Sequence, residues 1–406
     1  MEAPAALLPR PAAAAPADRQ PIVTIDAAAL AANWTLLSTL APASRTGAAV
    51  KADGYGLGAA EVARTLRTAG CRDFFVAWPS EGANLREFLG PPADIVTVPV
   101  DGSHESEALE EPRIFVLQGM EASAVPLLLR HRLIPVLSTP DDVAAWQTGL
   151  RLYGARAPAA VQIETGMNRL GLDERPARAV ADAMRAGSLD LVLLMSHLAS
   201  ADEETDQSEQ QRMRFLALSV LFPGLARSLA NSAGVFRGAP YHFDLTRPGI
   251  ALYGGEAGAP SRGLLRPVAT LSAAILQVRE AKAGEEAGYG GAAKLMRDTR
   301  IATVGLGYAD GYPRSASGAG VPVRARGPGA EAVIAGRRVP VLGRVSMDLT
   351  LLDVTDVPED AIAPGDRAEF FGPAMPMDEV ALAAGTISYE LLTSLGPRVK
   401  RVWLRD

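Results

Sequence analysis

The chain has 406 residues, of which 48% are hydrophobic and 21% charged, a composition typical of a globular protein long enough for two or three domains. Its 40 basic and 46 acidic side chains give a formal net charge of -6, which is mild and offers no reason to expect nucleic acid as a partner. The only cysteine, Cys71, excludes an intrachain disulfide, and the four histidines lack close metal-ligand spacing, so we expect no metal.

Residues 1–20 are rich in alanine and proline and are expected to form a disordered tail. A secretory signal needs a basic start and an unbroken apolar stretch, whereas here Glu2 is acidic and prolines interrupt the segment, so we expect a cytoplasmic protein. No window is apolar over the roughly eighteen residues that a membrane-spanning helix needs, so we expect no contact with a membrane.

Residues 21–258 alternate between short apolar runs typical of strands and longer segments with helical periodicity. Expected strands are 22–25, 48–50, 74–77, 95–100, 114–117, 133–137, 161–163, 189–195 and a run into 241–245. Expected helices are 27–40, 59–66, 81–88, a helix capped by Thr139 with Pro140 in its first turn, 176–186 and 207–221. This alternation is typical of parallel βαβ units and favours a (β/α)8 TIM-type barrel. A doubly wound open sheet has the same periodicity and stays an alternative.

Residues 259–406 have a different pattern and are expected to form a second, mainly β domain. Strand-type runs are 268–278, 300–306, 332–342 and 348–354, with turns at 318–320 and 327–329, and only 377–384 and 388–395 have helical periodicity. The fold class is therefore α/β, a barrel followed by a mainly β domain.

Lys51 directly follows the apolar run 48–50 and precedes a turn with three glycines and Tyr55. Lysine is a poor residue for a strand interior, so its amine is expected to lie where the apolar environment ends. Burial would lower the pKa of the amine and supply the neutral form needed for a Schiff base or for proton abstraction. The alternative is a lysine that leaves the strand and extends into water. The glycine turn alone is weak evidence, since it matches neither a Walker loop nor a dinucleotide fingerprint.

Nine short motifs occur in order along the chain. They are VKADGYG (50–56), ETGMNRLG (164–171), MSHLASAD (195–202), NSA (231–233), RPGIALYG (247–254), GYG (288–290), GYADGY (307–312), GRVSMD (343–348) and ISYE (387–390). Together they resemble the alanine racemase family, and the resemblance runs from about Ile22 to the C-terminus. It implies a barrel followed by a β domain, pyridoxal 5'-phosphate as the cofactor, and a homodimer whose active sites take residues from both chains.

The resemblance also implies a role for each matching residue. Lys51 matches the family's Schiff-base lysine, and Tyr289 matches the second base, delivered from the partner subunit. The implied cofactor-binding residues are Lys51, Tyr55, His197, Asn231, Ser232, Arg247, Gly249, Ile250 and Tyr389. Arg247 is expected to donate to the pyridine nitrogen, and His197 to lie within hydrogen-bond reach of the catalytic tyrosine.

The substrate side is implied by the same comparison of motifs. Arg169, Met347 and Asp348 are expected to bind the carboxylate of L-alanine or D-alanine, and Tyr308 and Tyr312 to narrow the entrance. Two positions depart from the family. Gln162 stands where some members carry a carbamylated lysine, so activity is expected to be independent of bicarbonate. Leu57 stands where many members have histidine.

The expected reaction is therefore the interconversion of L-alanine and D-alanine, in the service of D-alanine biosynthesis, by two bases on opposite faces of the substrate. Three alternatives stay open. One is a serine or broad-specificity racemase, because the motifs fix the mechanism better than the pocket size. Another is a decarboxylase of the same cofactor class, whose motifs we do not find. The last is a non-catalytic cofactor-binding protein, which would not need the β domain carrying Tyr289.

Overall fold

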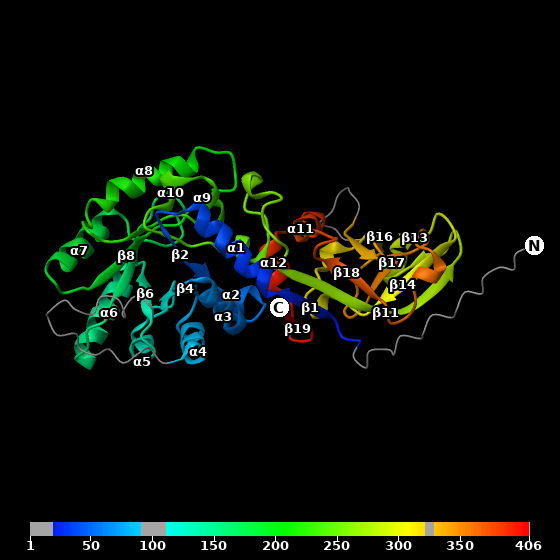
Figure 1. Ribbon diagram of the computed structural model, residues 1–406, viewed down its shortest axis with the longest axis horizontal. Helices are drawn as coiled ribbons and strands as arrows, with labels where there is room; N and C mark the ends of the chain where they lie inside the picture. The colour runs from blue at the N-terminus through cyan, green and yellow to red at the C-terminus, as the bar shows by residue number, and fades with distance from the viewer. Residues whose placement is uncertain (1–18, 91–110, 321–328, 406) are drawn as a thin grey trace, which may run out of the picture. The chain divides into compact units, whose positions relative to one another are not determined.

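A computed structural model describes residues 19–90, 111–320 and 329–405 of the protein (Figure 1). The predicted tail up to residue 18, the predicted strand 95–100 and most of the predicted turn 327–329 lie outside the described residues. Contacts divide the chain into two compact units. Of the described residues, the barrel unit takes 24–90, 111–269, 387–394 and 401–405, and the sheet unit takes 19–23, 270–320, 329–386 and 395–400. The boundary predicted between residues 258 and 259 stays a prediction.

The barrel unit is built on a parallel sheet whose seven strands follow one another in chain order. They are β3 (Ala48–Ala49), β4 (Asp73–Val76), β5 (Arg113–Val116), β6 (Ile134–Leu137), β7 (Ala159–Gln162), β8 (Leu191–Met195) and β9 (Arg227–Ser228). A separate parallel pair is formed by β2 (Arg45–Thr46) and β10 (Leu245–Thr246).

Backbone hydrogen bonds close these strands into a ring. On one side of β10, the Asp244 N–H donates to the carbonyl of Arg227 at 3.0 Å, which joins β10 to β9. On its other side, the N–H groups of Gly47 and Ala49 donate to the carbonyls of Thr246 and Pro248, both at 2.9 Å, which joins β10 to the chain of β2 and β3. The barrel is therefore closed, and the open-sheet alternative is wrong.

Apolar side chains from the strands fill the inside of the barrel. Phe75 on β4 lies opposite Phe115 on β5, and the two rings stack with centroids 4.8 Å apart. Ile134, Leu193 and Leu245 belong to the same buried cluster. Strands that are buried on both faces read as continuous apolar runs, which is why most of them were predictable from the sequence.

Helices surround the barrel strands (Figure 1). The helical segments of this unit are α1 (Ala27–Leu40), α2 (Lys51–Tyr55), α3 (Ala59–Ala69), α4 (Pro79–Leu89), α5 (Val125–Arg130), α6 (Pro140–Tyr153), α7 (Glu174–Arg185), α8 (Gln207–Ser219), α9 (Ser232–Phe236), α10 (Ala239–His242) and α12 (Ser388–Thr393), with short 3-10 turns η1 (Ala122–Ala124), η2 (Ile250–Tyr253) and η3 (Ala259–Ser261). The predicted cap of α6 is confirmed, since the Thr139 hydroxyl accepts from the Asp142 N–H at 3.0 Å and the Asp142 carboxylate accepts from the Thr139 N–H at 2.9 Å.

One strand prediction in the barrel unit is wrong. The predicted run into 241–245 begins with the helix α10, and only Leu245 and Thr246 form a strand. Pro240 in the first turn of α10 favours the helix, and Phe243 then turns the chain with φ of 52°. The two-residue strand β9 was not predicted, because a strand of that length has no periodicity to detect.

The other large sheet is mainly antiparallel, with strand order β14-β17-β16-β15-β18-β11-β1-β19. The strands are β1 (Ile22–Asp26), β11 (Ala269–Ala281), β14 (Thr299–Val304), β15 (Glu331–Ile334), β16 (Arg337–Leu342), β17 (Thr350–Asp353), β18 (Arg367–Phe371) and β19 (Lys400–Leu404), beside the small pair β12 (Glu286–Ala287) and β13 (Ala293–Lys294). The long strand β11 pairs with β18 through its first half and with β14 through its second, so the sheet closes on itself.

Short helical segments join these strands, namely η4 (Tyr289–Gly291), η5 (Tyr308–Asp310), η6 (Arg314–Ala316), η7 (Glu359–Ala361) and α11 (Met377–Ala384). The predicted run 332–342 proves to be a hairpin, because Ala335 and Gly336 turn the chain with φ of 48° and 74°. In the described parts of the chain, no helix combines the length and the apolar character needed to cross a membrane.

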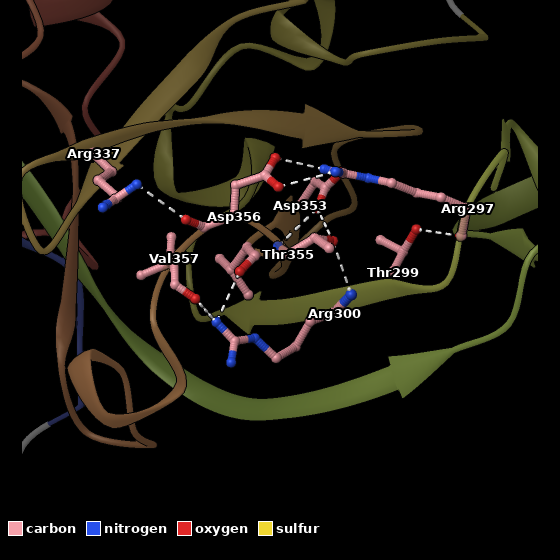
Figure 2. A network of polar contacts seen from close by, with 9 residues as sticks. Arg297, Thr299, Arg300, Arg337, Asp353, Thr355, Asp356 and Val357 are labelled. Carbon is pink, nitrogen blue, oxygen red and sulfur yellow. Dashed lines mark hydrogen bonds and ion pairs between the residues drawn. The ribbon is translucent and has the colours of Figure 1, made fainter.

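A polar network at one end of β14 holds the loop that follows β17 (Figure 2). The Arg297 guanidinium donates to both carboxylate oxygens of Asp356, at 3.0 and 2.7 Å. Arg300 donates through Nη2 to the carbonyls of Val354, at 3.0 Å, and Val357. Ion pairs as exposed as that of Arg297 add little stability, so the network mainly fixes the course of this loop.

Candidate active site

A pocket of about 510 Å³ is lined by residues at the carboxyl ends of the barrel strands. It brings together ten predicted site residues, namely Lys51, Tyr55, Arg169, His197, Asn231, Ser232, Arg247, Gly249, Ile250 and Tyr389. Tyr389 was expected in the second domain, but its segment Ile387–Ser394 belongs to the barrel unit. These residues come from loops that are far apart in sequence but meet because parallel barrel strands all end at the same rim.

Lys51 is the first residue of α2 and follows the end of β3. Its side chain is half-buried in the wall of the pocket. Burial lowers the pKa of the Lys51 amine, the positive charge of Arg169 lowers it further, and Glu81 acts in the opposite direction. A lowered pKa increases the fraction of neutral amine, which is the nucleophilic and basic form.

The turn after Lys51 has an unusual backbone. All five residues from 52 to 56 are left-handed, with φ between 53° and 81°. A left-handed conformation costs a non-glycine residue roughly 1–2 kcal/mol, so this turn needs support from its surroundings. The Asp53 carboxylate accepts from the Ala59 N–H, and the Glu81 carboxylate accepts from the Ala52 N–H, both at 2.8 Å.

Tyr55, at the end of this turn, is held against one side of the pocket. Its ring stacks on Tyr253 with centroids 4.5 Å apart and lies 6.1 Å from the ring of Tyr389. Burial raises the pKa of Tyr55, so its hydroxyl stays protonated and can donate a hydrogen bond. The Tyr253 hydroxyl donates to the carbonyl of Ala49 at 2.9 Å, which ties the stack to β3.

The same side of the pocket offers donors that suit a phosphate group. The Ser232 hydroxyl accepts from the N–H groups of Gly249 and Ala251, at 2.8 and 3.2 Å, so hydroxyl and amides converge. A Cβ on Gly249 would lie 2.2 Å from the Tyr55 hydroxyl oxygen, so the glycine keeps this space open. Asn231 supports the cluster by accepting from the Gly234 N–H at 2.9 Å. Hydroxyls and backbone N–H groups around such a space fit a bound phosphate.

Arg247 is buried and lines the pocket. Its guanidinium donates to the carbonyl of Ser196 at 2.6 Å and to the hydroxyl of Ser228. Burial lowers the pKa of Arg247 to about 9, which still leaves it a cation at neutral pH. A fixed cation with no ability to accept a hydrogen bond suits an unprotonated ring nitrogen.

His197 lies near Arg247, and its pKa is lowered to about 3 by burial and by the positive charges of Arg247, Arg169 and Lys51. The imidazole is therefore neutral at physiological pH. Gln211 on α8 fixes the chain here, because its side chain donates to the His197 carbonyl and accepts from the Ala199 N–H, both at 2.8 Å. A neutral imidazole can donate one hydrogen bond and accept another.

Arg169 extends from the loop between β7 and α7, and its side chain is exposed. The Glu164 carboxylate organises this loop by accepting from the N–H groups of Met167, at 2.7 Å, and Gly166. Gln162 holds the other end, since its side-chain amide donates to the carbonyl of Leu170 at 2.8 Å. Gln162, which stands where some family members carry a carbamylated lysine, thus contacts the backbone next to Arg169.

The remaining predicted site residues belong to the sheet unit. Tyr289 on η4 is 71% exposed and Met347 is 53% exposed. Asp348 accepts from Arg398 at 2.8 Å, and the same guanidinium donates to the buried Asp310 at 2.8 Å. Arg398 thereby links the motif GYADGY (307–312), which contains Tyr308, to the motif GRVSMD (343–348), which contains Met347.

The prediction that Tyr312 narrows an entrance is wrong. Tyr312 is 1% exposed, and its ring packs edge-to-face on Phe370 with centroids 4.9 Å apart. It is a core residue of the sheet unit. Tyr308 is 42% exposed, and its place at the entrance of the site stays a prediction.

Sequence reasoning missed several residues that shape the pocket. Glu81 supports the turn beyond Lys51, Tyr253 carries the ring of Tyr55, and Gln211 fixes the chain at His197. Tyr253 lies inside one of the nine motifs, so its position could have been noticed. Glu81 and Gln211 lie on helices where they resemble ordinary exposed polar residues.

Comparisons with known proteins agree along nearly the whole chain. The family profile described as "Alanine racemase, N-terminal domain" matches residues 25–257, and that described as "Alanine racemase, C-terminal domain" matches residues 268–403. The chain is 45% identical over 385 residues to the biosynthetic alanine racemase of Agrobacterium fabrum, which covers 94% of this chain and 93% of that protein.

Solved structures give the same result. An alanine racemase from Bartonella henselae with covalently bound pyridoxal phosphate is 32% identical, with a TM-score of 0.83 over 95% of this chain and 100% of that chain. The biosynthetic alanine racemase from Pseudomonas aeruginosa is 35% identical, with a TM-score of 0.81 over 96% of this chain and 100% of that chain. The family predicted from the nine motifs is thus confirmed, and the chain belongs to the alanine racemase family.

Proposed function

We propose that the protein is a pyridoxal 5'-phosphate-dependent alanine racemase that interconverts L-alanine and D-alanine with two bases, Lys51 and Tyr289 of the partner subunit. The single observation that carries the proposal is the position of Lys51. Its amine, with a lowered pKa, lines the same pocket as the hydroxyl and amide donors around Gly249 and the buried cation Arg247. Membership of the family and the relatives' activity support it.

The residues of the pocket fit the cofactor. Tyr55, Ser232 and Tyr389 would hold its phosphate together with the N–H groups of Gly249 and Ile250, and Lys51 would bind it covalently. When bound, pyridoxal phosphate withdraws electrons from the α-carbon of an amino acid and makes the α-proton acidic. Arg247 would donate to the ring nitrogen without giving up its proton, which limits that withdrawal and favours return of the proton over transamination.

Racemisation needs a proton removed from one face of the substrate and returned to the other. In this proposal the Lys51 amine serves one face, and its lowered pKa provides the neutral form. The hydroxyl of Tyr289 of the partner subunit serves the opposite face. His197, neutral at physiological pH, can donate a hydrogen bond to the oxygen of that tyrosine and stabilise the phenolate that forms when the hydroxyl loses its proton. Arg169, Met347 and Asp348 would bind the substrate carboxylate.

The homodimer is part of the proposal. Within the sheet unit, Tyr289 is 71% exposed and Met347 is 53% exposed, so both side chains are accessible to a second copy of the chain. We also infer a role in supplying D-alanine. Support comes from the relative named biosynthetic at 45% identity, although one named catabolic, from Rhizobium johnstonii, is 41% identical.

The test is the visible absorption of the purified protein, followed by addition of L-alanine and measurement of D-alanine over time. We expect an absorption band of the bound cofactor and accumulation of D-alanine, both lost in Lys51→Ala. A band without D-alanine would move the function to another amino acid or another reaction, and a panel with serine and larger amino acids would identify it. The absence of any band would overturn the cofactor and the site together.

A further inference from the structure

The turn that follows Lys51 has a costly backbone conformation, which its own hydrogen bonds, such as that from the Gly56 N–H to the Ala52 carbonyl at 2.7 Å, stabilise only in part. Residues 52–56 are all left-handed, and three of them, Ala52, Asp53 and Tyr55, carry a side chain. Such backbone persists only where neighbouring groups hold it. Because Lys51 is joined directly to Ala52, any relaxation of the turn would move the amine relative to the pocket.

Glu81 on α4 supplies that support from a neighbouring element. One oxygen of its carboxylate accepts from the Ala52 N–H at 2.8 Å. The other accepts from the N–H groups of Ala77, at 2.7 Å, and Trp78, at 3.3 Å. The second pair of bonds is what a glutamate at the third position of a helix normally makes, since it satisfies N–H groups at the helix start. The bond to Ala52 serves no such purpose for α4.

The carboxylate also lies in the electrostatic surroundings of Lys51. The charged groups that act on the amine come from two elements, Arg169 on the loop after β7 and Glu81 on α4, and they act in opposite directions. The positive charge of Lys51 helps to lower the pKa of His197, which is neutral at physiological pH. Glu81 is thus the group that offsets the effects of burial and of Arg169 on the amine.

We propose that Glu81 is a positioning residue for the reacting lysine, holding the left-handed turn through the Ala52 N–H and balancing the positive charge around the amine. This inference rests on the proposed function only for the identity of Lys51 as the reacting group. It predicts that Glu81 controls both the order of the turn and the proton affinity of Lys51.

The first experiment needs no bound cofactor and no turnover. The chain contains four lysines, Lys51, Lys282, Lys294 and Lys400, so ¹³C-methyl labelling of the amines in the cofactor-free protein gives few NMR signals, and Lys51→Ala assigns the one of interest. In Glu81→Gln the pKa of Lys51 should fall by roughly half a unit to one unit, because a nearby negative charge is lost. The control is Glu87→Gln on the same helix, whose side chain is 71% exposed and should leave that pKa unchanged.

The second experiment measures the turn itself. Hydrogen exchange of the peptide covering residues 51–58 should speed up several-fold in Glu81→Gln and more in Glu81→Ala, because the acceptor of the Ala52 N–H is weakened or removed. Glu87→Gln should again match the wild type. In the loaded enzyme, Glu81→Gln should lower kcat about tenfold with little change in KM and shift the lower limb of the pH profile of kcat.

These outcomes separate the two proposals. If the wild type does not racemise alanine, the lysine titration and the exchange rates still decide the role of Glu81. If Glu81→Gln leaves the pKa of Lys51 and the exchange of the turn at wild-type values, Glu81 only caps α4 and the inference is wrong. Should Glu81→Ala fail to fold, as judged by circular dichroism, Glu81→Gln alone carries the test, because glutamine keeps the size of the side chain but removes the charge and one of the two acceptor oxygens.

Discussion

Arg247 and His197 both line the pocket, and burial lowers the pKa of both side chains. It lowers the pKa of Arg247 to about 9 and, with the positive charge of Arg247 itself, lowers that of His197 to about 3. At neutral pH the pair therefore holds a single positive charge, on Arg247. His197 keeps one donor and one acceptor, which is the state that can hydrogen-bond a phenol without protonating it.

This depressed pKa predicts a dependence of stability on pH. Above the ordinary histidine pKa of about 6.5, His197 is neutral in both the folded and the unfolded chain and contributes nothing. Between that value and about 3, His197 is protonated in the unfolded chain but stays neutral in the folded chain. The free energy of unfolding should therefore fall by up to about 1.4 kcal/mol per pH unit as the pH drops, or about 2 kcal/mol at pH 5.

Urea denaturation of wild type and His197→Gln at pH 7 and pH 5 measures this contribution. Both proteins will lose stability through their carboxylates, so the relevant quantity is the difference between the two losses. The wild type should lose more. Equal losses would mean that His197 becomes protonated in the folded protein.

Gln162 gives a second prediction for a single residue. Its amide donates to the Leu170 carbonyl beside Arg169, so the loop is fixed without an anion. Racemisation by the wild type should not respond to added bicarbonate, whereas Gln162→Leu should raise KM for alanine several-fold because Arg169 is less well placed. Steady-state kinetics with and without bicarbonate measure both effects, and clear stimulation of the wild type would contradict the first.

At the scale of elements, the start of η2 is shaped by how closely it approaches the turn after Lys51. A Cβ on Gly249 would lie 2.2 Å from the Tyr55 hydroxyl oxygen and 3.1 Å from its ring carbon. This close contact restricts the position to glycine. Two elements that are far apart in sequence meet here with no space for a methyl group.

Gly249→Ala should therefore displace the Tyr55 phenol and weaken binding of pyridoxal phosphate by at least about tenfold, or roughly 1.4 kcal/mol. Titration of the cofactor-free protein, followed by visible absorption, measures the Kd. Gly305→Ala is the matched control, because its added Cβ would make ordinary contacts of 3.5 Å or more with Leu276. An unchanged Kd in Gly249→Ala would show that the phenol is not needed where the structure places it.

For the whole molecule, the proposed homodimer with shared sites makes a distinctive prediction. Lys51→Ala and Tyr289→Phe should each be almost inactive alone. When the two variants are mixed and allowed to exchange subunits, about half the dimers should contain one of each chain, and each mixed dimer should have one intact site. The mixture should therefore recover about a quarter of the wild-type activity.

The control is each variant taken through the same exchange by itself, which should recover nothing. If Lys51 and Tyr289 acted within one chain, no combination of the two variants could restore an intact site. Absence of recovery after subunit exchange has been verified by mass spectrometry would contradict the shared site.

Local patterns determined much of this protein. The buried strands β4 to β8 and the helices α6, α7 and α8 follow from apolar periodicity and from caps such as Thr139, because these signals arise from residues close in sequence. The position of Lys51 at the end of a strand was predicted by the same reasoning. The motifs then identified the family and its cofactor, and the pocket brings together the nine site residues expected in the barrel with Tyr389, which was expected in the second domain.

Tertiary structure decided what depends on distant parts of the chain. Closure of the barrel rests on hydrogen bonds from Gly47 and Ala49 to strand β10, some two hundred residues away, and strands as short as β9 and β10 have no period of their own. Glu81 was indistinguishable in sequence from an ordinary helix cap until the fold placed it against Ala52. The direction of each pKa shift likewise follows from burial and from charges that meet only in the folded chain, because no local pattern encodes what surrounds a side chain.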